Sequence, residues 1–185
     1  MEIKNLTKKF GDKLVFNKFS AEIPTGKTSF IMGESGCGKT TLLKILIGLD
    51  KDYDGEIKGL DGKISCVFQE PRLFPTLNVL ENLELVEKGA NLSSNELLRL
   101  VELENDTKLY PNELSGGMKM RLAIARALYY NGDTFIMDEP FSALDEELKE
   151  RLLPKLFALL KGKTVIVVSH NPIEADTYGD NIIKI

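Results

Sequence analysis

Short apolar runs, each bounded by polar or turn-forming residues, recur along the chain. Four of them are apolar at nearly every position: TSFIM (28–32), KISCVF (63–68), TFIMD (134–138) and TVIVVS (164–169). Consecutive apolar positions predict strands that are buried on both faces. Leu and Ile recur instead at helical spacing in three stretches: TTLLKILIGL (40–49), the segment from Gly116, and EELKERLLPKLFALLK (146–161). Strands that alternate with helices predict a mostly parallel sheet with helices on its faces.

Two regions depart from this alternation. The first, IKNLTKKF (3–10) followed by KLVFNKFSAEI (13–23), predicts antiparallel strands joined by a turn. The second, residues 70–131, combines prolines, acidic residues and helical periodicity, and it has no strand pattern. We therefore expect a single domain, 1–185, in which a core of 1–69 and 132–185 carries a helical insertion.

Composition narrows the class of protein. A chain of 185 residues with 43% hydrophobic and 28% charged residues is typical of a globular domain. Its net charge of −4 fits poorly with binding to nucleic acid. No apolar run approaches the roughly 20 residues that span a bilayer, and no signal peptide is evident. Cys37 and Cys66 have no zinc-like spacing, so we expect reduced thiols in a cytoplasmic protein.

The segment GESGCGKT, residues 33–40, matches the phosphate-binding pattern G-x-x-x-x-G-K-[ST] and lies between a predicted strand and a predicted helix. Its glycines let several backbone N–H groups point at one phosphate chain, at the positive end of a helix. Lys39 can reach the β- and γ-phosphates, and the Thr40 hydroxyl can bind Mg²⁺. The alternative is a plain glycine-rich turn, but the context favours nucleotide binding through Gly33, Glu34, Ser35, Gly36, Cys37, Gly38, Lys39, Thr40 and Thr41.

Polar side chains follow three of the predicted strands, at the sheet edge where α/β proteins bind ligands. Asp138 is the candidate ligand for Mg²⁺, and Glu139, the next residue, suits a general base for an attacking water. Gln69 offers an amide for Mg²⁺ or water, and His170, the one histidine of the sequence, can contact a γ-phosphate. The alternatives are a solvated acidic turn and a structural histidine.

In their order along the chain, these motifs resemble the ATP-binding cassette (ABC) ATPases, the motor subunits of ABC transporters. Phe10 resembles the aromatic residue that stacks on adenine, residues 33–40 the Walker A motif, and Gln69 the Q-loop. LSGGM (114–118) resembles the family signature, TFIMDE (134–139) the Walker B motif, SALD (142–145) the D-loop, and His170 the switch histidine. The resemblance implies a RecA-like P-loop NTPase fold, ATP and Mg²⁺ as cofactors, and catalysis by Lys39, Gln69, Glu139 and His170.

The resemblance also implies a dimer. In this family two cassettes pack head to tail, so Ser115, Gly116 and Gly117 would bind the nucleotide held by a partner's Walker A loop. The alternative is that Ser115 simply caps the helix that follows, although this does not account for the two glycines after it. The sequence departs from the family pattern at Met118 and Met120, where the family usually has Gln, and Phe10 replaces the commoner Tyr.

The sequence VFQEPRLFPTLNVLENL (67–83) resembles importers of nitrate, sulfonate, taurine and related solutes. The resemblance implies a subunit on the cytoplasmic face of the membrane that powers solute import. Its partners would be a second cassette, a transmembrane permease and a solute-binding protein, without nucleic acid. Two alternatives remain open: a cassette that serves DNA repair or translation, and an ATP-binding regulatory module.

Overall fold

The computed structural model describes residues 1–60 and 62–185. Its centre is a five-stranded sheet in the order β5-β6-β7-β3-β8, in which every neighbouring pair is parallel. The strands are β3 (Thr28–Met32), β5 (Ile64–Val67), β6 (Thr134–Asp138), β7 (Thr164–Val168) and β8 (Asn181–Lys184). The four predicted buried strands are confirmed, and β8, at the edge of the sheet, was not predicted.

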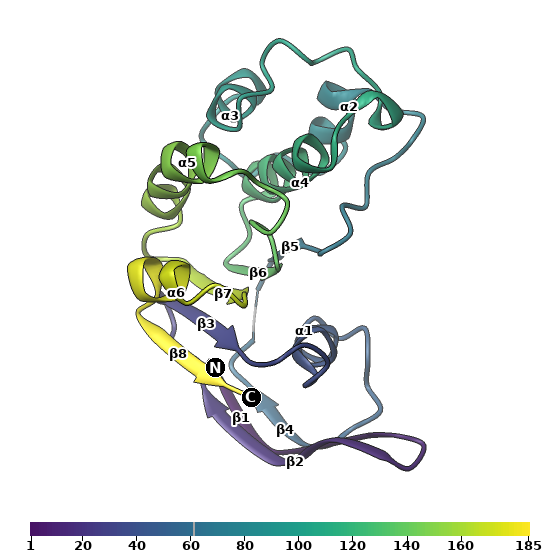
Figure 1. The fold of residues 1–185 in the computed structure, drawn as a ribbon, viewed down its shortest axis with the longest axis vertical. Helices are drawn as coiled ribbons and strands as arrows, with labels where there is room; N and C mark the ends of the chain where they lie inside the picture. Colours follow the sequence, from purple (N-terminus) through teal and green to yellow (C-terminus); the bar gives the residue numbers. More distant parts are fainter. Residues whose placement is uncertain (61) are drawn as a thin grey trace.

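A second sheet has three antiparallel strands in the order β2-β1-β4. Strands β1 (Glu2–Phe10) and β2 (Lys13–Glu22) confirm the predicted antiparallel pair, whereas β4 (Asp54–Lys58) was not predicted. Figure 1 shows this sheet at one end of the molecule, with helix α1 (Lys39–Leu46) between it and the parallel sheet. Ile3, Leu6 and Phe16 of the antiparallel sheet share one buried cluster with Leu42 of α1 and Ile136 of β6.

The other face of the parallel sheet packs against helices. Because successive side chains of a strand point to opposite faces, Phe135 and Met137 of β6 join a different cluster from Ile136. This cluster contains α4 (Gly116–Tyr130) and α5 (Glu146–Leu159) and also includes Ala175 of α6 (Pro172–Tyr178). Helix α6 was not predicted, and α1 ends three residues before the predicted limit, where Gly48 adopts a left-handed φ of 73°.

Residues 70–131 contain the elements α2 (Val79–Glu84), α3 (Ser94–Leu100), a 3₁₀ turn η1 (Pro111–Glu113) and α4, and no strand. Capping boxes start α2 at Asn78 and α3 at Ser93, each with a Glu three residues later. Figure 1 shows α2, α3 and α4 grouped at the end of the molecule opposite the antiparallel sheet. Within residues 1–60 and 62–185, no helix is long and apolar enough to cross a membrane. The predicted fold class, an α/β fold with a mostly parallel sheet, is confirmed.

Candidate nucleotide-binding site

The loop between β3 and α1 needs glycine at several positions. Gly36 and Gly38 have φ values of 81° and 111°, which side-chain-bearing residues rarely adopt. A Cβ atom at Gly38 would also lie 2.6 Å from Cγ1 of Val15. Gly38 is the N-cap of α1 and has no side chain to satisfy the first N–H groups of the helix. These donors are therefore available to an anion.

Lys39, the first residue of α1, brings a positive charge to this loop. Its Nζ donates hydrogen bonds to the carbonyl oxygens of Gly33 (2.7 Å) and Glu34 (2.8 Å) and lies 4.0 Å from Sγ of Cys37. The ammonium group thus lies over the loop at its phosphate-binding side.

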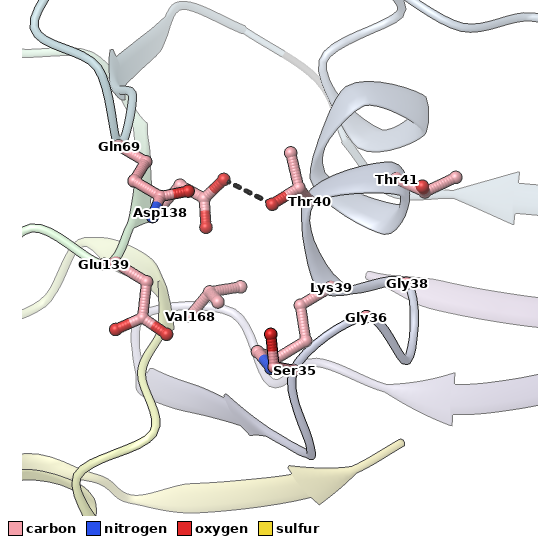
Figure 2. A pocket seen from close by; sticks show the side chains of 10 residues that line it. All are labelled: Ser35, Gly36, Gly38, Lys39, Thr40, Thr41, Gln69, Asp138, Glu139 and Val168. Atoms are coloured by element: carbon pink, nitrogen blue, oxygen red, sulfur yellow. Dashed lines mark hydrogen bonds between the residues drawn. The ribbon is translucent and has the colours of Figure 1, made fainter.

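The loop forms one wall of a cavity of about 240 Å³. Figure 2 shows Gln69, Asp138 and Glu139 on one side of this cavity and the loop with Lys39 and Thr40 on the other. The residues that line the cavity are Ser35, Gly36, Gly38, Lys39, Thr40, Thr41, Gln69, Asp138, Glu139 and Val168. All but Val168 were predicted as site residues. Valine carries no chemical signal, and only its position at the carboxyl end of a buried strand could have indicated this role.

Thr40 and Asp138 form the part of the cavity that suits a divalent cation. The Thr40 hydroxyl donates a hydrogen bond of 2.9 Å to Oδ2 of Asp138. Asp138 is 4% exposed, and among residues 1–60 and 62–185 its buried Oδ1 has no hydrogen-bond partner. Burial raises the pKa of the Asp138 carboxyl above its ordinary value, against the opposing effects of the Thr40 hydrogen bond and the Lys39 charge.

A buried carboxylate oxygen without a partner fits an Mg²⁺ ligand, held directly or through water. Asp138 and the amide of Gln69 offer oxygen ligands from one wall of the cavity, and the Thr40 hydroxyl offers one from the other. Across residues 1–60 and 62–185, no group of three or more His, Cys, Asp or Glu side chains could hold a metal ion.

Glu139 and His170 form a second pair at the edge of the cavity. Nδ1 of His170 lies 2.9 Å from Oε2 of Glu139. The two side chains come from the carboxyl ends of the neighbouring strands β6 and β7, and the Glu139 N–H donates to the Val168 carbonyl (2.9 Å). Glu139 has a φ of 47°, which is uncommon for a residue with a side chain and typical of strained functional positions. His170 itself is not among the lining residues; its side chain is 71% exposed.

Other predicted residues lie outside this cavity. Phe10, at the end of β1, is 54% exposed, and Nζ of Lys8 lies 4.7 Å from its ring centroid. Gly33, Glu34 and Cys37 belong to the same loop but do not line the cavity.

The LSGGM residues are separate from the cavity of their own chain. The Ser115 hydroxyl accepts a hydrogen bond of 3.2 Å from the Met118 N–H, so Ser115 caps α4. A Cβ at Gly116 would meet open space, whereas one at Gly117 would lie 2.9 Å from the carbonyl oxygen of Ala143. Gly117 thus allows the start of α4 to approach the SALD segment closely.

The fold and the cavity together define a P-loop nucleotide-binding protein, since a glycine loop, a helix N-terminus, a lysine and a buried carboxylate converge on one space. A family model described as "ABC transporter" matches residues 16–142. This match covers more than half of the chain, so the chain belongs to the ABC transporter family.

Curated relatives agree with this assignment. The chain is 39% identical over 202 residues to the spermidine/putrescine import ATP-binding protein PotA of Thermotoga maritima, covering 98% of this chain and 55% of that protein. It is also 39% identical over 194 residues to the aliphatic sulfonates import ATP-binding protein SsuB of Bacillus cereus, covering 97% and 77%. The chain therefore spans about half the length of the first relative and about three quarters of the second. The predicted similarity to importer cassettes is confirmed.

Solved structures are similar over the whole chain. A dimeric structure of the bacterial ABC transporter cassette MJ0796 matches with a TM-score of 0.84 and 34% identity, covering 100% of this chain and 93% of that one. A dimeric post-hydrolysis state of the same cassette, bound to ADP and Pi, gives a TM-score of 0.85 and 36% identity. The predicted P-loop NTPase fold and the predicted class, an ATP-binding subunit of the ABC ATPase family, are confirmed.

Proposed function

We propose that this chain binds Mg-ATP in the cavity between the glycine loop and the ends of β6 and β7, and hydrolyses it to power import of a small solute. The observation that carries the proposal is that two pairs of side chains, Thr40 with Asp138 and Glu139 with His170, meet at this cavity. Thr40 bonds to Asp138 where a cation is needed, and Glu139 contacts His170 where the terminal phosphate would lie. Phosphoryl transfer to water requires a cation at the phosphates and a group that orients or deprotonates the attacking water; Asp138 and Glu139 are the proposed sources of these two roles.

In this mechanism the loop amides and Lys39 hold the phosphate chain. Thr40, Asp138 and Gln69 would hold Mg²⁺, which neutralises charge on the β- and γ-phosphates. Glu139 accepts a proton from the attacking water, and His170 donates a hydrogen bond to the γ-phosphoryl group as its charge develops. Positioning and charge stabilisation supply most of the acceleration in such a reaction.

Two groups of residues outside the cavity also have proposed roles. One contacts the adenine base, and the other contacts the nucleotide bound to a second subunit. Phe10 is the proposed stacking partner of adenine, since its ring is half exposed. Ser115, Gly116 and Gly117 would cap the nucleotide of an identical subunit, because they line no part of their own chain's cavity. The similarity to dimeric cassettes supports this arrangement.

The names of the relatives suggest further partners, a membrane permease and a solute-binding protein. Because these relatives are import ATP-binding proteins, we propose that residues 70–131 form a helical subdomain that contacts a transmembrane permease at the cytoplasmic face of a membrane. A solute-binding protein would deliver the substrate. Relatives of equal identity are named for the import of aliphatic sulfonates and of spermidine and putrescine, so the proposed solute is a small organic molecule.

The test is phosphate release from ATP by purified wild-type, Lys39→Ala and Glu139→Gln proteins, with nucleotide affinity measured separately. We expect each variant to lose on the order of 100-fold or more in turnover. Glu139→Gln should still bind ATP, because its side chain acts on water. Lys161→Ala, an exposed lysine far along the chain, is the control and should match wild type. Wild-type turnover by Glu139→Gln would contradict the proposed role of Glu139 as the base.

A further inference from the structure

His170 stands on a short loop whose flanking residues are both tied to one buried carboxylate. The side chain of Glu174, in α6, accepts a hydrogen bond from the Ser169 hydroxyl (2.9 Å) and another from the Asn171 amide (3.2 Å). The Ser169 hydroxyl in turn accepts from the Asn171 N–H (3.0 Å). Glu174 is 6% exposed and Ser169 is 3% exposed, so the network is shielded from water.

A third donor reaches the same carboxylate from another helix. Nζ of Lys149, in α5, lies 3.2 Å from Oε1 of Glu174 and 3.0 Å from Oε1 of Glu146. Helix α5 begins directly after its N-cap Asp145, the last residue of SALD. Figure 1 shows α5 and α6 as neighbours beside the end of β7. The loop with His170 is thus joined through Glu174 to the helix that follows the SALD segment.

A buried carboxylate is expensive, and one that is fully hydrogen-bonded tends to fix the backbone around it. Few side-chain contacts fix the position of the His170 ring. The ring is 71% exposed, and its hydrogen bond among the described residues is to Glu139. The position of the imidazole therefore depends on the backbone at Ser169 and Asn171, both of which Glu174 holds.

We propose that Glu174 is a positioning residue for ATP hydrolysis, which sets the location of His170 through Ser169 and Asn171. This inference rests on the proposed function, in which His170 contacts the γ-phosphoryl group. Glu174 is buried and does not line the proposed nucleotide cavity. Its removal displaces the imidazole, and a displacement of about 1 Å can cost on the order of 100-fold in rate.

The test compares kcat, KM and nucleotide affinity in wild type, Glu174→Met and Glu174→Gln. Met has a similar length and removes both acceptor oxygens, whereas Gln keeps one acceptor for Ser169. We expect Glu174→Met to lower kcat by about 10- to 100-fold with KM and ATP affinity within about twofold of wild type. Glu174→Gln should recover part of that loss. Asp176→Asn, an exposed acidic residue on the same helix, is the matched control and should retain wild-type kcat.

The second part of the test repeats Glu174→Met and Glu174→Gln in a His170→Ala background. If Glu174 acts through His170, neither substitution should lower kcat further by more than about twofold, because the group that it positions is already gone. An equal loss in both backgrounds would show a general structural effect and overturn the inference. A wild-type kcat for Glu174→Met would also overturn the inference. If Glu174→Met does not fold, an undiminished kcat for Glu174→Gln would overturn it instead. Wild-type turnover by His170→Ala alone would instead contradict the proposed function of the histidine, and the inference with it.

Discussion

At the scale of single residues, Asp138 shows a conflict between stability and function. Its carboxylate is buried, one of its oxygens has no hydrogen-bond partner in the described part of the chain, and burial raises its pKa. A carboxyl whose pKa is raised by folding loses stabilising free energy as the pH rises through that pKa, because the ionised form is disfavoured in the folded protein. At neutral pH the free protein therefore bears the cost of a site suited to a cation.

We predict that Asp138→Asn makes the nucleotide-free protein more stable while weakening its response to Mg²⁺. Asn keeps an acceptor for the Thr40 hydroxyl and removes the buried charge. A gain of about 1 kcal/mol would raise Tm by roughly 2–4 °C in a chain of this size. The gain should shrink as the pH falls through the raised pKa of Asp138, since both side chains are then neutral.

Thermal unfolding without nucleotide measures the predicted gain in stability. Titration with Mg²⁺ in the presence of ATP measures the predicted loss of the response to Mg²⁺. Asp176→Asn again serves as the control, because it removes an exposed carboxylate and should leave Tm unchanged. A lower Tm for Asp138→Asn at neutral pH would mean that its charge stabilises the free protein, contrary to the argument from burial.

Much of the site was predictable at this scale, for a physical reason. Parallel strands bring their carboxyl ends to one edge, so residues that follow different strands, such as Gln69 and Asp138, meet at one cavity. The sequence did not show the left-handed backbone of Glu139 or its contact with His170, because both depend on how β6 and β7 are paired. The stacking role of Phe10 remains a prediction.

At the scale of elements, Asn82 of α2 holds the loop that precedes its own helix. The side chain is fully buried; its amide donates to the carbonyl oxygens of Phe74, Leu77 and Asn78, and its oxygen accepts from the Phe74 N–H (2.8 Å). No apolar side chain can replace these four bonds, so their loss leaves backbone groups unsatisfied.

We predict that Asn82→Ala lowers the free energy of unfolding by about 1–3 kcal/mol. Asn82→Asp should cost at least as much as Ala, because its buried carboxylate would face the carbonyl oxygens of Phe74, Leu77 and Asn78, to which it cannot donate. Urea unfolding of both variants measures the effect, with Asn91→Ala, at an exposed position, as the matched control. Stability of Asn82→Ala equal to that of the control would show that the loop does not depend on this side chain.

The elements that the sequence did not predict share one property. Strand β4 (DGEIK) buries almost nothing, β8 (NIIK) is a short edge strand with alternating burial, and α6 has only seven residues. Each of these elements depends on contacts with other elements, as β4 depends on its pairing with β1. The periodic pattern in its own sequence is therefore too weak to recognise. The buried strands and the longer helices were predicted because burial imposes a pattern on their sequences.

At the scale of the whole molecule, the LSGGM segment lies outside the cavity that the P-loop lines. The cavity contains the loop but not Ser115, Gly116 or Gly117. Gly116 faces open space, while the close approach of Gly117 to Ala143 fixes the start of α4 against the SALD segment of the same chain. Ser115 and Gly116 are exposed, as the proposed contact with another subunit's phosphate requires.

We predict that the Glu139→Gln protein forms a dimer with Mg-ATP and is a monomer without it, since binding without hydrolysis holds the two subunits closed. Ser115→Arg, added to Glu139→Gln, should abolish the dimer, because a long cationic side chain occupies the space for the partner's phosphate. Asn95→Arg, at an exposed position of α3, adds the same charge elsewhere and should leave the dimer intact. Sedimentation velocity distinguishes these states. Glu139→Gln that stays monomeric with ATP bound would contradict the proposed pairing of identical subunits and would require a different cassette, or the membrane permease, to complete the site.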